Sequence, residues 1–284
     1  MMYNRIIRDV FLLILALDIG NSSVAFGVYD QHGEGELLLT SKLSAVTTRQ
    51  CDEYAVMLSG ILAMNNIKLS DIDGAIMSSV VPPLTGVIEA AVRRLTGLTP
   101  MIVGPGIKTG LNIKIDHHTQ LGSDIVANVT AALTTAKPPF VVIDIGSATT
   151  FTVVNAKCEL CGVIIAPGVR KALDALSDSA AELPYISLEK PKQFLAKNTI
   201  DSMKCGAIYG SVFMIEGFIE RIRSELGIAP DEVLDVTATG GLAGCIIPYC
   251  SGKYNIKNIP TLTLDGLYRL YQKNRTQQSS RNMI

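Results

Sequence analysis

Apolar and polar positions follow one another along the chain in blocks that predict strands and helices in turn. Short apolar runs predict buried strands at residues 12–17, 24–29, 74–81, 101–103, 140–143, 151–154 and 233–238. Longer segments with apolar residues at helical spacing predict helices at residues 54–65, 85–96, 121–135, 206–226 and 264–273. This alternation of strands and helices favours an α/β fold.

The segment 206–226 has the clearest amphipathic pattern. Its apolar stripe consists of Ile208, Val212, Ile215, Ile219 and Ile222. The opposite face, which we expect to be partly solvated, carries Glu216, Glu220, Arg221 and Arg223. We expect the stripe to be broad enough to serve both a domain core and a subunit interface.

One pattern of residues occurs twice. Asp18-Ile19-Gly20-Asn21-Ser22-Ser23 follows the first apolar run, and Asp144-Ile145-Gly146-Ser147-Ala148-Thr149-Thr150 follows a later one, 126 residues on (144 − 18). Each motif leads into a second strand-like run and then a polar turn. A solenoid would repeat at a much shorter period. The repeat therefore predicts two similar domains, residues 12–117 and 118–273, that meet near His117 and His118, with terminal extensions at 1–11 and 274–284.

Composition and charge exclude several classes of protein. The 284 residues are 48% hydrophobic and 18% charged, with a mean hydropathy of +0.32, which excludes a disordered chain. Lys and Arg number 25 and Asp and Glu 26, so the basic excess typical of nucleic-acid or anionic-membrane binders is missing. Six cysteines are too few for a disulfide scaffold and fit a reducing cytosol. The apolar run before Asp18 is too short to span a membrane, so we expect a cytoplasmic protein.

The repeated motif has chemistry suited to phosphate. Gly20 permits close backbone approach, and the polar residues after it can offer N–H and hydroxyl donors to phosphate oxygens. The aspartate can hold a hydrated Mg²⁺, which prefers one or two carboxylates together with substrate phosphates. A single copy is most often an ordinary turn. Two facing copies would form a nucleotide cleft with two carboxylates, an arrangement suited to phosphoryl transfer.

Three further motifs are weaker and leave alternatives open. Thr239-Gly240-Gly241 ends a strand and could lie flat against a nucleotide or simply turn the chain. Asp124 falls in the first turn of a helix, where an acid complements the helix dipole, or could act as a general base in a cleft. Cys158 and Cys161 form a CxxC pair, but a zinc site needs further ligands.

Taken together, these motifs resemble the phosphate and adenosine motifs of the actin-like superfamily. More specifically, the chain from Leu13 to about Asn274 resembles the type III pantothenate kinases. The stretches that carry the resemblance are 17–22, 78–83, 103–106, 108–112, 122–124, 144–150, 166–168, 197–199 and 239–243. Each is weak alone, but their number and order are specific.

The resemblance implies two actin-like (ribonuclease H-like) domains and the ATP-dependent phosphorylation of pantothenate to 4′-phosphopantothenate, the first step of coenzyme A synthesis. It implies ATP with Mg²⁺, a monovalent cation (potassium or ammonium) at Asp144, and Asp124 as the base. The ATP contacts that it implies are Asp18, Ile19, Gly20, Asn21, Ser22, Ser23, Val24, Ala25 and Ser147. The pantothenate contacts that it implies are Gly122, Ser123, Asp124, Ile125 and Thr199. It also implies a homodimer in which the second subunit borders the pantothenate pocket.

Two positions depart from the family pattern. The family often has Arg directly after the catalytic Asp, where this chain has Ile125. It often has an aromatic residue where this chain has Ile115. Both positions lie near the family's substrate pocket, so the aliphatic pair indicates either a drier pocket or altered acceptor binding. Two alternatives therefore stay open, a non-catalytic nucleotide-binding regulator and a kinase of another small hydroxyl compound.

Overall fold

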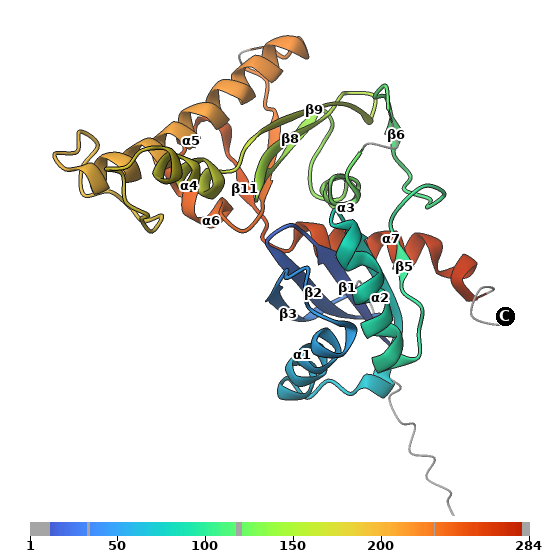
Figure 1. Cartoon of the computed structure of the whole chain (residues 1–284). Helices are drawn as coiled ribbons and strands as arrows, with labels where there is room; N and C mark the ends of the chain where they lie inside the picture. The colour runs from blue at the N-terminus through green and yellow to red at the C-terminus, as the bar shows by residue number, and fades with distance from the viewer. Residues whose placement is uncertain (1–11, 33–34, 118–120, 230, 280–284) are drawn as a thin grey trace, which may run out of the picture. The chain divides into compact units, whose positions relative to one another are not determined.

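The computed structural model of the chain describes residues 12–32, 35–117, 121–229 and 231–279 and has the predicted α/β arrangement (Figure 1). The chain forms two compact units. The first unit consists of Met1–Lys108, Gly122–Asp124 and Leu267–Ile284, and the second of Thr109–Leu121 and Ile125–Gly266. The chain thus passes between the units four times. The domain bounds 12–117 and 118–273 stay a prediction, and the extensions at 1–11 and 280–284 lie outside the described residues.

The first unit contains a five-stranded mixed sheet. Its strand order is β3 (Leu37–Ser44), β2 (Ser23–Asp30), β1 (Leu13–Ile19), β4 (Ile72–Ser79) and β5 (Met101–Ile102). The first three strands are antiparallel to one another, whereas β4 and β5 continue the sheet in parallel with β1. Parallel neighbours place the ends of β1 and β4 at the same edge of the sheet.

Helices cover both faces of this sheet. On one face, α1 (Cys51–Met64) and α2 (Pro82–Thr96) pack on an apolar core that includes Leu15, Leu17 and Phe26. On the other face, α7 (Leu262–Ser279) stacks Tyr268 on Tyr29 with ring centroids 4.7 Å apart. The strand β1 is apolar almost throughout because both of its faces are buried.

The second unit repeats this strand order and adds one strand. Its sheet has the order β11 (Lys257–Asn258), β10 (Asp235–Thr239), β7 (Phe140–Ile145), β8 (Ala148–Val154), β9 (Glu159–Pro167) and β6 (Asn112–Ile113). As in the first unit, the central strand has an antiparallel neighbour after its acidic motif and a parallel neighbour on its other side. The duplication predicted from the motifs is therefore present in the topology.

Helices also cover both faces of the second sheet. The apolar stripe of α5 (Thr199–Glu225) is buried on one face, together with the short α6 (Ala243–Ile246) and the start of α4 (Val169–Ser179). The other face is covered by α3 (Ser123–Ala132) and by Leu262 at the start of α7. The stripe predicted for α5 is confirmed, and it fills the core of its own unit.

The structure differs from the predicted elements in several places. The strands β3 and β9 and the helix α4 were not predicted. The helix α5 begins seven residues earlier than expected, at Thr199 rather than Gly206. The closing helix continues to Ser279, so residues 274–279 are helical rather than a polar tail. Asn274 is buried there because its side-chain amide bonds both the N–H and the C=O of Lys108. Among the described residues, no helix is long and apolar enough to cross a membrane.

Candidate functional site

The first acidic loop, residues 18–23, lies where β1 ends. Asp18 is paired in the sheet with Ser78 of the parallel strand β4, and the Ser78 hydroxyl donates a 2.6 Å hydrogen bond to Asp18 Oδ1. Ser78 is fully buried. The buried hydroxyl therefore fixes the orientation of the Asp18 carboxylate at the edge of the sheet.

The tip of this loop is open to solvent. The Gly20 N–H donates to the Ser23 carbonyl at 2.9 Å, which closes the turn, and Asn21 and Ser22 are exposed. The side chains of Ile19 and Val24, by contrast, belong to the apolar core. A phosphate at this loop would therefore meet the backbone and the polar side chains of the tip, and Ile19 and Val24 could contribute backbone groups only.

The helix α3 begins beside the same strand ends. Its first residue, Ser123, is bonded through the hydroxyl to both backbone groups of Ser79: the Ser79 N–H donates to Ser123 Oγ at 3.1 Å, and Ser123 Oγ donates to the Ser79 carbonyl at 3.2 Å. Ser79 is in turn paired with Ile19 of β1. Asp124, the next residue in the helix, therefore belongs to the same compact unit as the first acidic loop.

The second acidic loop, residues 144–150, has a different partner for its aspartate. The side-chain amide of Asn128 in α3 donates to Asp144 Oδ2 at 3.2 Å, and its carbonyl oxygen accepts a 2.7 Å hydrogen bond from Thr263 of α7. Asn128 is only 2% exposed.

The start of α7 packs closely on α3 at a glycine. A Cβ added to Gly266 would lie 1.9 Å from the carbonyl oxygen of Ala127, so glycine is required for α7 to pack this closely on α3.

Two glycines cover this second loop. Gly240 has a φ of +98°, and a Cβ there would lie 2.4 Å from Asp144 Oδ1. A Cβ on Gly168 would lie 2.3 Å from the carbonyl oxygen of Ser147. The Thr239-Gly240-Gly241 motif, which was weak in sequence, thus packs directly against Asp144. The second unit thereby brings together three predicted elements: Asp144, Ser147 and this glycine pair.

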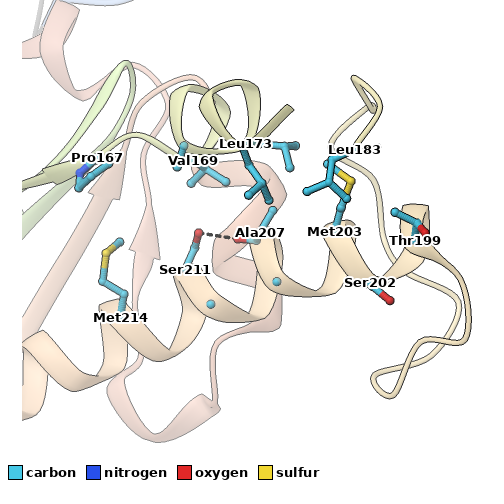
Figure 2. Close-up of a pocket in the computed structure, with 14 residues that line it drawn as sticks. Pro167, Val169, Leu173, Leu183, Thr199, Ser202, Met203, Ala207, Ser211 and Met214 are labelled. Carbon is cyan, nitrogen blue, oxygen red and sulfur yellow. Dashed lines mark hydrogen bonds between the residues drawn. The ribbon is translucent and has the colours of Figure 1, made fainter. Parts of the chain in front are cut away.

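Thr199 lines an apolar pocket of about 570 Å³ between α4 and α5 (Figure 2). The pocket extends to Pro167 and Val169, which flank Gly168 and therefore adjoin the second acidic loop. In Figure 2, Leu173 of α4 and Met203 of α5 point into the space between the two helices. Thr199 itself is exposed at the first position of α5.

The two departures from the family pattern lie in one apolar cluster. Ile125 is 8% exposed and belongs to the core beneath α3, and Ile115 packs against the same core. A side chain buried in this way offers a ligand an apolar surface and no charge. Both aliphatic side chains therefore contribute to the same apolar core of the second unit.

The cysteines show no sign of a metal centre. All six are free thiols, and no group of three or more His, Cys, Asp and Glu side chains able to hold a metal occurs in the part of the chain that the structure describes. Burial raises the pKa of Cys161, and burial with the nearby charge of Glu216 raises the pKa of Cys250 to about 11. Both thiols are therefore protonated near neutral pH. Only the deprotonated thiolate binds a metal or acts as a good nucleophile. His117 is exposed, and His118 lies outside the described residues.

Sequence reasoning missed two polar residues that the structure brings to the acidic loops. Ser78 was named only as part of a stretch that resembles the family, and no role was predicted for it, although it lies in a strand that ends beside β1. Asn128 follows Asp124 by four residues and so lies on the same face of α3. An asparagine inside the otherwise apolar run 125–132 was a signal that could have identified it.

Comparison with known proteins identifies close relatives. The family model described as type III pantothenate kinase matches residues 14–221. A type III pantothenate kinase of Pelobacter propionicus is 41% identical over 263 residues, covering 93% of this chain and 100% of the relative. One from Geobacter sulfurreducens is 37% identical over 264 residues, with the same coverage.

Solved structures of low sequence identity share the fold. A propionate kinase from Francisella tularensis has a TM-score of 0.50 at 14% identity, covering 91% of this chain and 98% of that chain. A reductive activator for a corrinoid, iron-sulfur protein has a TM-score of 0.53 at 10% identity, covering 97% of this chain and 63% of that chain. These likenesses concern the fold alone and agree with the two actin-like domains that the family resemblance implies.

Proposed function

The chain belongs to the type III pantothenate kinases, and from this premise we propose that it phosphorylates pantothenate with ATP, using Asp124 as the general base. The reaction is inferred from the family membership. The role of Asp124 is inferred from the bonds between its neighbour Ser123 and Ser79, because these bonds connect the start of α3 to the strand ends that hold the first acidic loop. The proposed base and the proposed phosphate loop thus belong to one unit.

In the proposed reaction, the 4′-hydroxyl of pantothenate attacks the γ-phosphorus of ATP. Asp124 accepts the hydroxyl proton as the new O–P bond forms, and the bond from the γ-phosphorus to the bridging oxygen breaks to release ADP. General-base catalysis of this kind contributes a factor of about 10²–10⁴ to the rate. The remaining acceleration comes from holding the reactants in line and from stabilising charge on the phosphoryl oxygens.

The first acidic loop is proposed to hold the ATP phosphates. Its exposed tip offers the amide of Asn21, the hydroxyl of Ser22 and nearby backbone groups. Asp18 is the carboxylate that would hold Mg²⁺, which neutralises phosphate charge when it is bound. The buried Ser78 hydroxyl supports this role because it orients the carboxylate before any ligand arrives.

The second acidic loop is proposed to hold the monovalent cation and the remaining ATP contact, Ser147. Asp144 supplies a negatively charged oxygen whose direction is fixed by Asn128. Such an oxygen can coordinate a potassium ion or accept an N–H hydrogen bond from an ammonium ion. Gly240 brings backbone close to this carboxylate, and Gly168 packs against the Ser147 carbonyl of the same loop, which favours a compact, preformed site over an open one.

The pantothenate pocket is proposed to include Gly122 to Ile125 of one subunit and Thr199, with the partner subunit bordering it. Exposed apolar side chains are concentrated around α4 and α5, at Ile165, Leu176, Tyr185, Phe194, Leu195, Ile200 and Phe213. Exposed apolar side chains that are grouped in this way are typical of protein interfaces. It supports a homodimer formed through the second unit, with two-fold symmetry as the commonest arrangement.

A coupled assay of ADP release, with and without pantothenate, tests the proposed function. We expect ADP release to depend on pantothenate and to yield 4′-phosphopantothenate. Nucleotide binding without turnover would indicate the regulatory alternative instead. Turnover with another small hydroxyl compound, and none with pantothenate, would show that the apolar pair Ile115 and Ile125 has changed the acceptor.

A further inference from the structure

The hydroxyl of Ser123 connects two elements that are far apart in the sequence. It accepts a hydrogen bond from the Ser79 N–H at 3.1 Å and donates one to the Ser79 carbonyl at 3.2 Å. Serine at the start of a helix usually bonds the N–H of the second or third helical residue. Here the hydroxyl instead bridges 44 residues to the end of β4.

Ser79 is itself a junction of the first unit. Its own hydroxyl accepts a 2.8 Å hydrogen bond from Thr85 in α2, and its backbone is paired with Ile19 at the end of β1. The preceding residue, Ser78, orients Asp18. Through Ser79, the first turn of α3 is therefore joined to α2, to β4 and to the strand that carries the first acidic loop.

The bonding capacity of the Ser123 hydroxyl bears on its role. A hydroxyl has one proton to donate, and this proton is used on the Ser79 carbonyl. The side chain therefore has no second proton to donate to a bound ligand. Donating a hydrogen bond to pantothenate would require breaking the bond to the Ser79 carbonyl, which helps to hold α3 in place.

We propose that the side chain of Ser123 is a positioning group that holds Asp124 at the correct distance from the phosphate loop, so that Ser123 contributes only its backbone to the proposed pantothenate pocket. This inference rests on the proposed role of Asp124 as base. A displacement of about 1 Å in a reacting group can lower a rate by about 10²-fold. Losing a two-bond link at the first residue of α3 allows a movement of this size at the second residue.

The test compares Ser123→Ala with Thr130→Val, a matched control on the same helix. Thr130 is buried, and its hydroxyl bonds the Val126 carbonyl within α3. Each change removes one hydroxyl, so both variants should lose stability by similar amounts in urea unfolding. We expect Ser123→Ala to lower kcat by about 10- to 100-fold and leave the Kd for ATP within about twofold. We expect Thr130→Val to change kcat less than about twofold, because it leaves the link to Ser79 intact.

A double variant distinguishes positioning from an independent effect. If Ser123 acts through Asp124, Ser123→Ala combined with Asp124→Asn should have the same kcat as Asp124→Asn alone. Near-normal kcat in Ser123→Ala would overturn the inference, as would losses that multiply in the double variant. Near-normal turnover of Asp124→Asn would instead contradict the proposed base itself. If Ser123→Ala does not fold, Ser123→Cys carries the same comparison, since it retains a weak donor of similar size.

Discussion

The two acidic loops occupy equivalent places in two sheets of the same strand order, yet their surroundings differ. Between the paired residues Ile19 and Val24 the first loop has four residues, whereas between Ile145 and Thr149 the second has three. Asp18 is oriented by a serine of the neighbouring strand, and Asp144 by an asparagine of the helix α3. The first loop has an exposed tip, and the second is covered by glycine backbone.

This difference indicates how a duplicated scaffold can support two tasks. An exposed tip with polar side chains can follow a flexible chain of phosphates. A carboxylate enclosed by close backbone contacts suits a small ion whose position must be fixed. The shared strand order places both aspartates at strand ends, and the local partners then determine what each one does.

Replacing Asp18 should lower turnover far more than it lowers stability. In Asp18→Asn the carboxylate charge is lost at the phosphate loop, while the Ser78 hydroxyl still has an oxygen to bond. We expect kcat to fall by about 10²–10³, the range found when one group that stabilises the transition state is removed. Steady-state kinetics at saturating ATP and Mg²⁺ measure this. If kcat were unchanged while Asp144→Asn abolished turnover, the assignment of the two loops would have to be reversed.

The glycines should differ in how much stability they supply. A Cβ at Gly168 would lie 2.3 Å from a backbone oxygen, whereas a Cβ at Gly20 would have its nearest contact at 3.4 Å. We expect Gly168→Ala to lower the free energy of unfolding by about 2–3 kcal/mol, since backbone must move, and Gly20→Ala by less than about 1 kcal/mol. Urea unfolding of the two variants provides the comparison. Equal losses would show that the second loop is no more tightly enclosed than the first.

Cation dependence should belong to the second loop only. We expect faster turnover in potassium or ammonium than in sodium at equal ionic strength, because Asp144 has a fixed direction. Asn128→Ala should reduce this preference and raise the half-saturating potassium concentration by about tenfold, in keeping with a lost hydrogen bond to a charged group of about 1.5 kcal/mol. Asp18→Asn should lower turnover without altering the preference. If the unaltered protein turned over at equal rates in all three salts, the proposed cation site at Asp144 would be contradicted.

The two units should also differ in assembly. Exposed apolar side chains in the second unit cluster around α4 and α5, whereas those of the first, such as Val56 and Met64, are scattered. We expect a homodimer whose dilution lowers activity and pantothenate affinity together, by a few-fold, with a smaller effect on ATP binding. Sedimentation at assay concentrations gives the oligomeric state. A monomer with full activity would show that the pantothenate pocket is complete within one chain.

The α/β class and the buried stripe of α5 could be predicted because they follow from the spacing of apolar residues within single segments. The duplication could be predicted because the same motif follows two separate apolar runs. The strand β3 was missed although its polar and apolar residues alternate. The helix α4 was missed although its apolar residues have helical spacing. The link from Ser123 to Ser79 could not be predicted, because it joins residues 44 apart through backbone groups that every sequence shares. The length of α7 was underestimated for a similar reason. Asn274 is a polar residue that the sequence places in an exposed tail, but its bonds to the backbone of Lys108 allow it to be buried within the helix.

The role of Asp124 as base is tested most directly by the turnover of Asp124→Asn, measured together with its affinity for ATP. The substitution retains the shape of the side chain but removes its ability to accept a proton. Our account predicts that kcat for pantothenate phosphorylation falls by about 10²–10⁴, while the Kd for ATP stays close to that of the unaltered protein because both acidic loops are intact. Near-normal turnover would show that Asp124 only complements the dipole of α3 and would contradict the proposed mechanism.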